Sequence, residues 1–197
     1  AEAQKAWRRE PVEVRVNLLI AMAKVLRAGK TVYASMITRE MGKTLAESAQ
    51  EAALLAEKVA VTLEEQVVAR VRGYELPGGA TRMNRCTYRP LGVMAVVGPF
   101  NFPAHLPNGH WVPALLAGNT VVFKPSEKTP AVGELLGQLM REAGAPGGVF
   151  EVVQGGAGVA AALVAHDGID GILFTGSWPV GRRILEANLD RPGRSQH

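Results

Sequence analysis

The sequence predicts an α/β fold in which a doubly wound parallel sheet follows N-terminal helices and a projecting antiparallel strand pair. Short apolar runs such as Val93 to Val97 and Thr120 to Phe123 each end at a breaker, as strands covered on both faces do. Helical patterns alternate with these runs in the second half of the chain, whereas the first part has helical periodicity alone. We therefore expect a helical part at 1–70, the strand pair at 71–90 and the sheet at 91–197.

The bulk composition is typical of a globular chain. The 197 residues are 47% hydrophobic and 20% charged, with a net charge of +4. Because the basic residues are spread along the chain and do not interleave with aromatic ones, we expect no nucleic-acid partner. No apolar run approaches the roughly 20 residues that span a bilayer, and the N-terminus has no signal-peptide pattern, so we expect no membrane partner and a cytoplasmic location.

The first part of the chain predicts three helices. Ala3 to Ala28 has helical spacing, with Pro11 as a break or a first-turn residue. A second helix covers about Thr31 to Met41, and Thr44 is placed to cap a third that continues to about Arg70. The apolar stripe of this third helix is interpreted as core packing.

Two strands joined by a turn follow these helices. Val71 to Leu76 and Met83 to Tyr88 flank the turn residues Pro77 to Ala80. The second strand holds the single cysteine, Cys86, which excludes an internal disulfide and a cysteine-rich zinc site. A thiolate nucleophile is one interpretation of Cys86. Its place in an alternating strand favours a structural role.

Strands and helices alternate in the second half. A helix over Ala104 to Ala117 separates the first two strands, and Thr129 with Pro130 is a suitable N-cap and first-turn pair for the next helix. The remaining predicted elements are a helix end at about Ala143, a strand at Val149 to Val153, a helix at Gly158 to Ala165, a strand at Gly171 to Phe174 and a helix at Ser177 to Asn188.

Polar side chains follow the first two strands of this sheet, where ligands of open α/β sheets bind. Asn101 follows the first strand, and Lys124, Ser126 and Glu127 follow the second. An Asn amide can donate to a developing oxyanion, and a Lys with a Glu can hold the hydroxyls of a ribose. The residues alone therefore predict a nucleotide-binding half-sheet with one candidate catalytic donor.

Two glycine clusters compete for the phosphates of that nucleotide. Gly156 to Ala161 fits the dinucleotide pattern G-x-G-x-x-A after a strand, although its expected acidic partner is ambiguous because Asp170 comes too early. Gly176 to Gly181 opens a helix and would direct backbone amides at an anion. We assign the phosphates to Ser177 and the first turn of this second helix.

The histidines do not predict a metal site. His105 and His110 are five residues apart and therefore lie about 140° from each other around a helix, unlike a metal-binding pair. We interpret both as helix-surface or core residues, with lining of a substrate or cofactor passage as the alternative.

The ordered motifs of this region resemble the aldehyde dehydrogenase family. They are Pro99-Phe100-Asn101-Phe102-Pro103, Pro113-Ala114-Leu115 with Gly118-Asn119, Lys124-Pro125-Ser126-Glu127 with Thr129-Pro130, and Phe174-Thr175-Gly176-Ser177 with Gly181. The resemblance implies a Rossmann-like domain, Asn101 as the catalytic oxyanion donor, and an NAD site, with NADP as the alternative. The implied cofactor residues are Val97, Pro99, Phe100, Lys124, Ser126, Glu127, Gly155, Phe174, Thr175, Gly176, Ser177, Val180 and Gly181.

The resemblance also implies the reaction and the partners. The run His105 to His110 is similar to the branch that oxidises N-succinylglutamate 5-semialdehyde in arginine degradation, so an aldehyde or semialdehyde substrate is expected. In the family, the projecting strand pair takes part in subunit association, which predicts a homo-oligomer. Lys124 and Glu127 are expected to hold the adenosine ribose, and the Gly155 region to pack beside the adenine.

The resemblance covers about Ala3 to about Pro192. The family's general base and its nucleophilic cysteine come later, and neither has a counterpart in this sequence. We therefore expect an internal portion of an aldehyde dehydrogenase, with an incomplete sheet and an exposed edge, that is inactive alone. A non-catalytic nucleotide-binding or subunit-association module is the alternative. A short Rossmann oxidoreductase that uses Gly156 to Ala161 lacks a Tyr-x-x-x-Lys pair after that loop.

Overall fold

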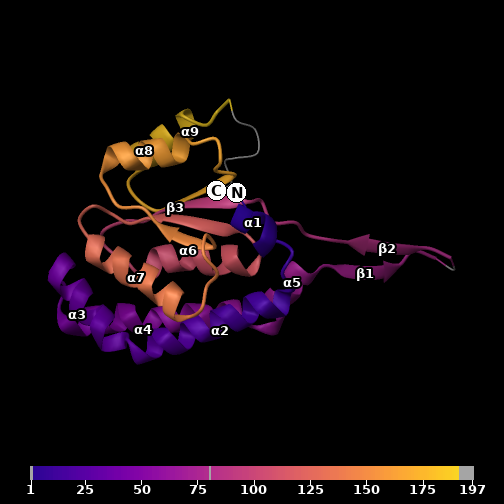
Figure 1. The fold of residues 1–197 in the computed structure, drawn as a ribbon, viewed down its shortest axis with the longest axis horizontal. Helices are drawn as coiled ribbons and strands as arrows, with labels where there is room; N and C mark the ends of the chain where they lie inside the picture. The colour runs from indigo at the N-terminus through magenta and orange to yellow at the C-terminus, as the bar shows by residue number, and fades with distance from the viewer. Residues whose placement is uncertain (1, 80, 191–197) are drawn as a thin grey trace.

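The computed structural model describes residues 2–79 and 81–190 and has the predicted α/β architecture. Figure 1 shows a central sheet between two helical layers, a further layer of N-terminal helices below them, and a narrow arm that projects from one end. The predicted turn residue Ala80 and the segment 191–197 of the predicted sheet part lie outside the described residues.

The main sheet is parallel, and its strand order is β5-β4-β3-β6. The helices α6 and α7 cover one face, and α8 and α9 cover the other (Figure 1). This change of face makes the sheet doubly wound, as predicted. Among the described strands, β5 and β6 are the edges. The bounds are β3 Val93–Val97, α6 His105–Leu116, β4 Thr120–Lys124, α7 Pro130–Glu142, β5 Phe150–Val152, α8 Ala157–Ala165, β6 Gly171–Phe174 and α9 Trp178–Glu186.

The N-terminal layer has more helices than predicted, because two predicted helices are interrupted. Pro11 separates the first two helices as the N-cap residue of the second. The long third helix was predicted to continue to Arg70 but stops after Thr62, whose hydroxyl donates back to the Lys58 carbonyl at 2.8 Å. Such back-bonding bends helices and competes with their continuation. The bounds are α1 Glu2–Trp7, α2 Val12–Ala28, α3 Lys30–Met41, α4 Leu45–Thr62 and α5 Glu65–Arg72.

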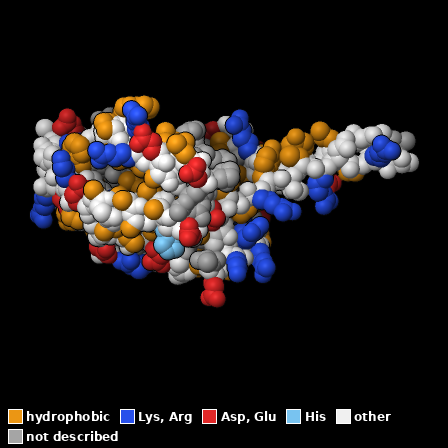
Figure 2. All heavy atoms as spheres, turned by 90° about the horizontal axis from the view of Figure 1, so that it is seen from above, with side chains coloured by type: hydrophobic (Ala, Val, Ile, Leu, Met, Phe, Trp, Pro, Cys, Tyr) orange, Lys and Arg blue, Asp and Glu red, His pale blue; other side chains and the backbone are white. Residues whose placement is uncertain are grey.

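The arm is a two-stranded antiparallel ribbon of β1 (Tyr74–Pro77) and β2 (Met83–Cys86). The strand predicted from Val71 begins later, because α5 continues to Arg72 and Gly73 turns the chain at φ +76°, a conformation that favours glycine. Hydrophobic side chains gather on the arm beside the body (Figure 2). Large apolar side chains exposed on the arm are those of Tyr74, Leu76 and Met83.

The core lies mainly between the sheet and the helices α6 and α7. The Trp111 side chain is fully buried at its centre and meets the rings of Phe123 and Phe150 edge-on, at centroid distances of 4.9 and 5.1 Å. These contacts connect α6 to two neighbouring strands. A smaller core on the opposite face includes Ala95 and Val97 of β3. Successive side chains of β3 therefore pack into the cores on both faces of the sheet. The continuous apolar run of this strand predicts such burial on both faces.

We expect Trp111→Ala to lower the free energy of unfolding by about 3 to 5 kcal/mol, because it leaves a cavity in a close-packed core. Urea denaturation measures this change. The control Val32→Ala alters a side chain that is 56% exposed and should stay within about 0.5 kcal/mol of the parent chain. Equal effects of the two substitutions would contradict the assignment of Trp111 to the centre of the core.

Candidate functional site

The candidate site lies where β3, β4 and β6 end together. The Gly98 amide donates to the Lys124 carbonyl at 3.1 Å, and the Thr175 amide donates to the Val97 carbonyl at 3.2 Å. These bonds hold the three strand ends in one row. The loops after β3 and β6 lead to helices on opposite faces of the sheet (Figure 1), and ligands of open α/β sheets bind beyond the strand ends at such a change of face.

The structure brings the predicted site residues to this edge of the sheet. Asn101 is exposed on the loop after β3. The residues predicted to bind the cofactor lie at the ends of the strands, in the loops that follow or in the first turns of α9. Those on β3 and its loop are Val97, Pro99 and Phe100; those on β4 and its loop are Lys124, Ser126 and Glu127; Gly155 follows β5; and Phe174, Thr175, Gly176, Ser177, Val180 and Gly181 belong to β6, its loop and α9.

Lys124 is buried, with only 3% of its side chain exposed. Its ammonium donates to the carbonyls of Pro125 and Gly155, the latter at 2.7 Å. The Glu127 carboxylate lies 3.8 Å away. Burial lowers the pKa of Lys124 below its ordinary value, and Glu127 acts in the opposite direction. Lys124 therefore ties the loop after β4 to the loop after β5, and Glu127 remains exposed beside it.

The loop after β6 wraps closely around an aromatic ring. A Cβ atom on Gly176 would lie 2.5 Å from the Phe174 ring, and one on Gly181 would lie 3.2 Å from it. This close approach explains why glycine occupies both positions. The first turn of α9 carries Ser177 as N-cap, and its hydroxyl makes no capping hydrogen bond. The first turn of α9 therefore has no side-chain acceptor for its amides among the described residues.

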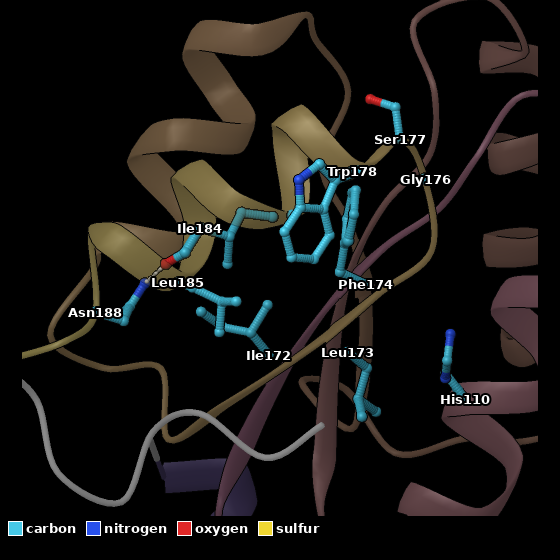
Figure 3. A pocket seen from close by; sticks show the side chains of 11 residues that line it. His110, Ile172, Leu173, Phe174, Gly176, Ser177, Trp178, Ile184, Leu185 and Asn188 are labelled. Atoms are coloured by element: carbon cyan, nitrogen blue, oxygen red, sulfur yellow. Dashed lines mark hydrogen bonds between the residues drawn. The ribbon is translucent and has the colours of Figure 1, made fainter.

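A pocket of about 370 Å³ lies beside this turn. Its walls come from α9 on one side and from β6 and α6 on the other (Figure 3). The lining is mostly apolar, and its polar side chains are those of His110, Ser177 and Asn188. Of these, Asn188 donates to the Ile184 carbonyl at 2.8 Å and so closes the far end of α9.

His110 was interpreted from the sequence as a helix-surface or core residue, with lining of a substrate or cofactor passage as the alternative. Its side chain is half-buried, lines the pocket and lies 2.7 Å from the Thr175 hydroxyl through Nε2. Burial, followed by the nearby Lys58 ammonium, lowers the pKa of His110 below its ordinary value. Pro107 and Ala114, three residues before and four after, are buried. This helical spacing is the signal that could have placed His110 on a buried stripe.

Two helix N-termini at this edge are already filled by carboxylates of the chain. Glu51 accepts hydrogen bonds from the amides of Ala104 and His105 at the start of α6. Glu40 accepts from the amides of Ala131 and Val132 in the first turn of α7, at 2.9 and 2.8 Å. The predicted cap of α7, Thr129, makes no such bond and is fully buried. Thr129 and Pro130 are the N-cap and first-turn residues, as predicted, but the side-chain acceptor of the α7 amides is Glu40.

The N-termini of α8 and α9 have no side-chain cap in the described part of the chain. At α8, Gly156 and Gly158 would each accept a Cβ atom with nothing within 4 Å. The acidic residue considered for this cluster, Asp170, accepts from the Val93 amide at 2.8 Å and therefore lies at the amino end of β3, away from the candidate site. Gly155, directly before Gly156, is close-packed, because its Cβ atom would lie 2.4 Å from the Val159 side chain.

The other candidate groups lie elsewhere. Cys86 is on β2 of the arm, which projects away from the main sheet (Figure 1). Within residues 2–79 and 81–190, no three His, Cys, Asp or Glu side chains gather as metal ligands. In the same residues, no helix is long and apolar enough to cross a membrane.

Comparison with known proteins agrees with this architecture. The model of the aldehyde dehydrogenase family matches residues 1–195. The chain belongs to the aldehyde dehydrogenase family. A curated relative, N-succinylglutamate 5-semialdehyde dehydrogenase 1 of Caulobacter vibrioides, is 47% identical over 186 residues, which are 94% of this chain and 39% of that protein. The chain therefore spans about two fifths of the length of this relative.

Solved structures of aldehyde dehydrogenases superpose closely on the chain. The NAD-dependent aldehyde dehydrogenase of Sinorhizobium meliloti gives a TM-score of 0.90 at 30% identity, over 98% of this chain and 39% of that one. The NADP-dependent glyceraldehyde-3-phosphate dehydrogenase of Bacillus halodurans, solved with NADP, gives 0.86 at 36% identity, over 94% and 40%. These similarities confirm the predicted family and fold.

The lowered pKa of His110 predicts a pH-dependent stability. Above the ordinary His pKa of about 6.5, the residue is neutral in both the folded and the unfolded chain and adds no pH dependence. Below it, the unfolded chain takes up a proton that the folded chain resists, so the free energy of unfolding should fall as the pH decreases.

Urea denaturation between about pH 7.5 and about pH 5.5 measures this loss. His110→Asn should lose less stability over that range than the parent chain. Equal losses in the two chains would show that His110 titrates alike in the folded and unfolded states.

Proposed function

We propose that this chain is the NAD(P)-binding portion of an aldehyde dehydrogenase that oxidises N-succinylglutamate 5-semialdehyde to the carboxylic acid. The observation that carries the binding assignment is the uncapped first turn of α9 at the edge of the sheet where β4 ends with the Lys124–Glu127 pair. The substrate assignment is supported by 47% identity to a relative with that enzyme name.

The residues present fit a dinucleotide. The α9 amides and Ser177 would hold the pyrophosphate, since an uncapped helix N-terminus favours an anion. Lys124 and Glu127 would hold the adenosine ribose, with the Gly155 loop beside the adenine. Because the Lys124 ammonium already serves two carbonyls while Glu127 is exposed, a ribose 2′-phosphate would meet a carboxylate, which favours NAD over NADP.

Asn101 is proposed to stabilise the oxyanion that forms when a thiolate attacks the aldehyde. Bound NAD would accept the hydride from that adduct. Among the described residues, the only thiol is that of Cys86, which lies on the arm. We therefore propose that the residues described here do not complete the reaction, and that the 197-residue chain binds the cofactor without oxidising aldehydes.

We further propose that the arm associates with a second copy of the chain. A two-stranded ribbon is marginally stable alone, and Tyr74, Leu76 and Met83 expose more than half of their surface. An added strand or apolar surface from another subunit would cover them.

A matched pair of glycine variants tests the phosphate assignment. Gly176→Ala should weaken NAD binding about tenfold or more, which corresponds to about 1.4 kcal/mol, because its Cβ forces the loop away from the Phe174 ring. Gly156→Ala should bind as the parent chain does, because its Cβ has open space. Titration with NAD can be followed by the fluorescence of Trp178, which is 74% exposed next to the site.

The opposite order, with Gly156→Ala impaired and Gly176→Ala unchanged, would move the phosphates to α8. Failure of the folded parent chain to bind either NAD or NADP would overturn the proposed function. Thermal unfolding of each variant shows whether a loss of binding is a loss of fold.

A further inference from the structure

The loop that carries Asn101 is hydrogen-bonded at its end to Glu51 of the helix α4. Glu51 is fully buried, and its Oε1 atom accepts from the Ala104 amide at 3.1 Å and from the His105 amide at 3.2 Å. These amides belong to the first residues of α6, three and four positions after Asn101. A buried carboxylate on a helix N-terminus is favoured by charge and by hydrogen bonding. Glu51 therefore fixes where the loop ends.

A lysine joins this cap to the loop itself. Lys43, between α3 and α4, donates to the second carboxylate oxygen of Glu51 at 2.7 Å. The same ammonium lies 3.6 Å from the centroid of the Phe102 ring. Because the Lys43 side chain is only 16% exposed, both its ion pair and its cation–π contact are partly desolvated and therefore stronger than surface contacts.

Asn101 depends on these neighbours for its position. Its side chain is exposed and makes no hydrogen bond within the described residues. Phe102 on one side lies under Lys43, and Phe100 on the other lies under Lys128, whose ammonium is 4.6 Å from the ring centroid. Of these two contacts, the one through Lys43 is shorter and is continuous with the buried cap.

We propose that Glu51 and Lys43 are positioning residues that hold Asn101 at the candidate site. The proposal rests on the proposed role of Asn101 as oxyanion donor, which requires its amide to stay in one place when charge develops. Glu51 orders the backbone after Asn101, and Lys43 orders the neighbouring ring. Neither residue touches the reacting atoms; both act through Asn101.

Nuclear magnetic resonance of the full ¹⁵N-labelled chain tests this proposal, since it reads the side-chain amide of Asn101 directly. Glu51→Gln keeps the shape but loses the charge, so the exchange of the Ala104 and His105 amides should rise about tenfold and the Asn101 signals should shift or broaden. Lys43→Met should change the Asn101 signals as well, and Lys43→Arg should restore them, because it keeps the cation.

The matched control is Glu40→Gln, which weakens the equivalent cap on α7. It should speed the exchange of Ala131 and Val132, whose amides Glu40 accepts, and leave the Asn101 signals unchanged. This comparison separates positioning of the loop from a general loss of stability, which would move both sets of signals in both variants.

Unchanged Asn101 signals in folded Lys43→Met would overturn the proposal. Equal responses of the Asn101 signals to Glu51→Gln and Glu40→Gln would overturn it too. If Glu51→Gln does not fold, Lys43→Met decides, because that side chain is partly exposed. NAD titration of the parent chain tests the proposed function independently. Absence of NAD binding would count against that function and would not change what the Asn101 signals say about Glu51 and Lys43.

Discussion

The unpaired backbone amides at the helix N-termini are the constraint on which this site depends. Helices that follow parallel strands all begin at the same edge of the sheet, so each brings amides that need an acceptor. Here Glu51 and Glu40 supply acceptors for α6 and α7. The first turn of α9 has none from a side chain. The capped termini fix the loops that precede them. The N-termini of α8 and α9 have no side-chain cap among the described residues, and the proposal assigns that of α9 to the phosphates of a ligand.

The N-terminal helices α2 to α4 therefore do more than pack against α6 and α7. The helix α3 supplies Glu40, α4 supplies Glu51, and the turn between them supplies Lys43. Each of these side chains reaches a segment that directly follows β3 or β4. The Trp111 cluster holds α6 against the same strands from within. Packing contacts and polar contacts from different parts of the chain thus fix the positions of the loops after β3 and β4.

Local pattern was sufficient for most of the fold and insufficient for long-range polar contacts. Apolar runs between breakers located the strands, and β6 has the predicted bounds Gly171–Phe174. The end of α4 was not predicted. There the Thr62 hydroxyl donates to the Lys58 carbonyl one turn earlier. Thr129 is the N-cap residue of α7 as predicted, but the acceptor of the helix amides is Glu40, which lies 91 residues before Ala131 and has no local signal. The partners of Glu51, Ala104 and His105, lie 53 and 54 residues later in the chain and likewise have no local signal.

A crystal structure of the 197-residue chain with NAD is the most direct test of the central claim, that this edge of the sheet binds a dinucleotide in one orientation. The account predicts pyrophosphate density on the amides at Ser177 and the first turn of α9, with the adenosine ribose beside Lys124 and Glu127. Density for the pyrophosphate on the first turn of α8, at Gly156, would contradict it.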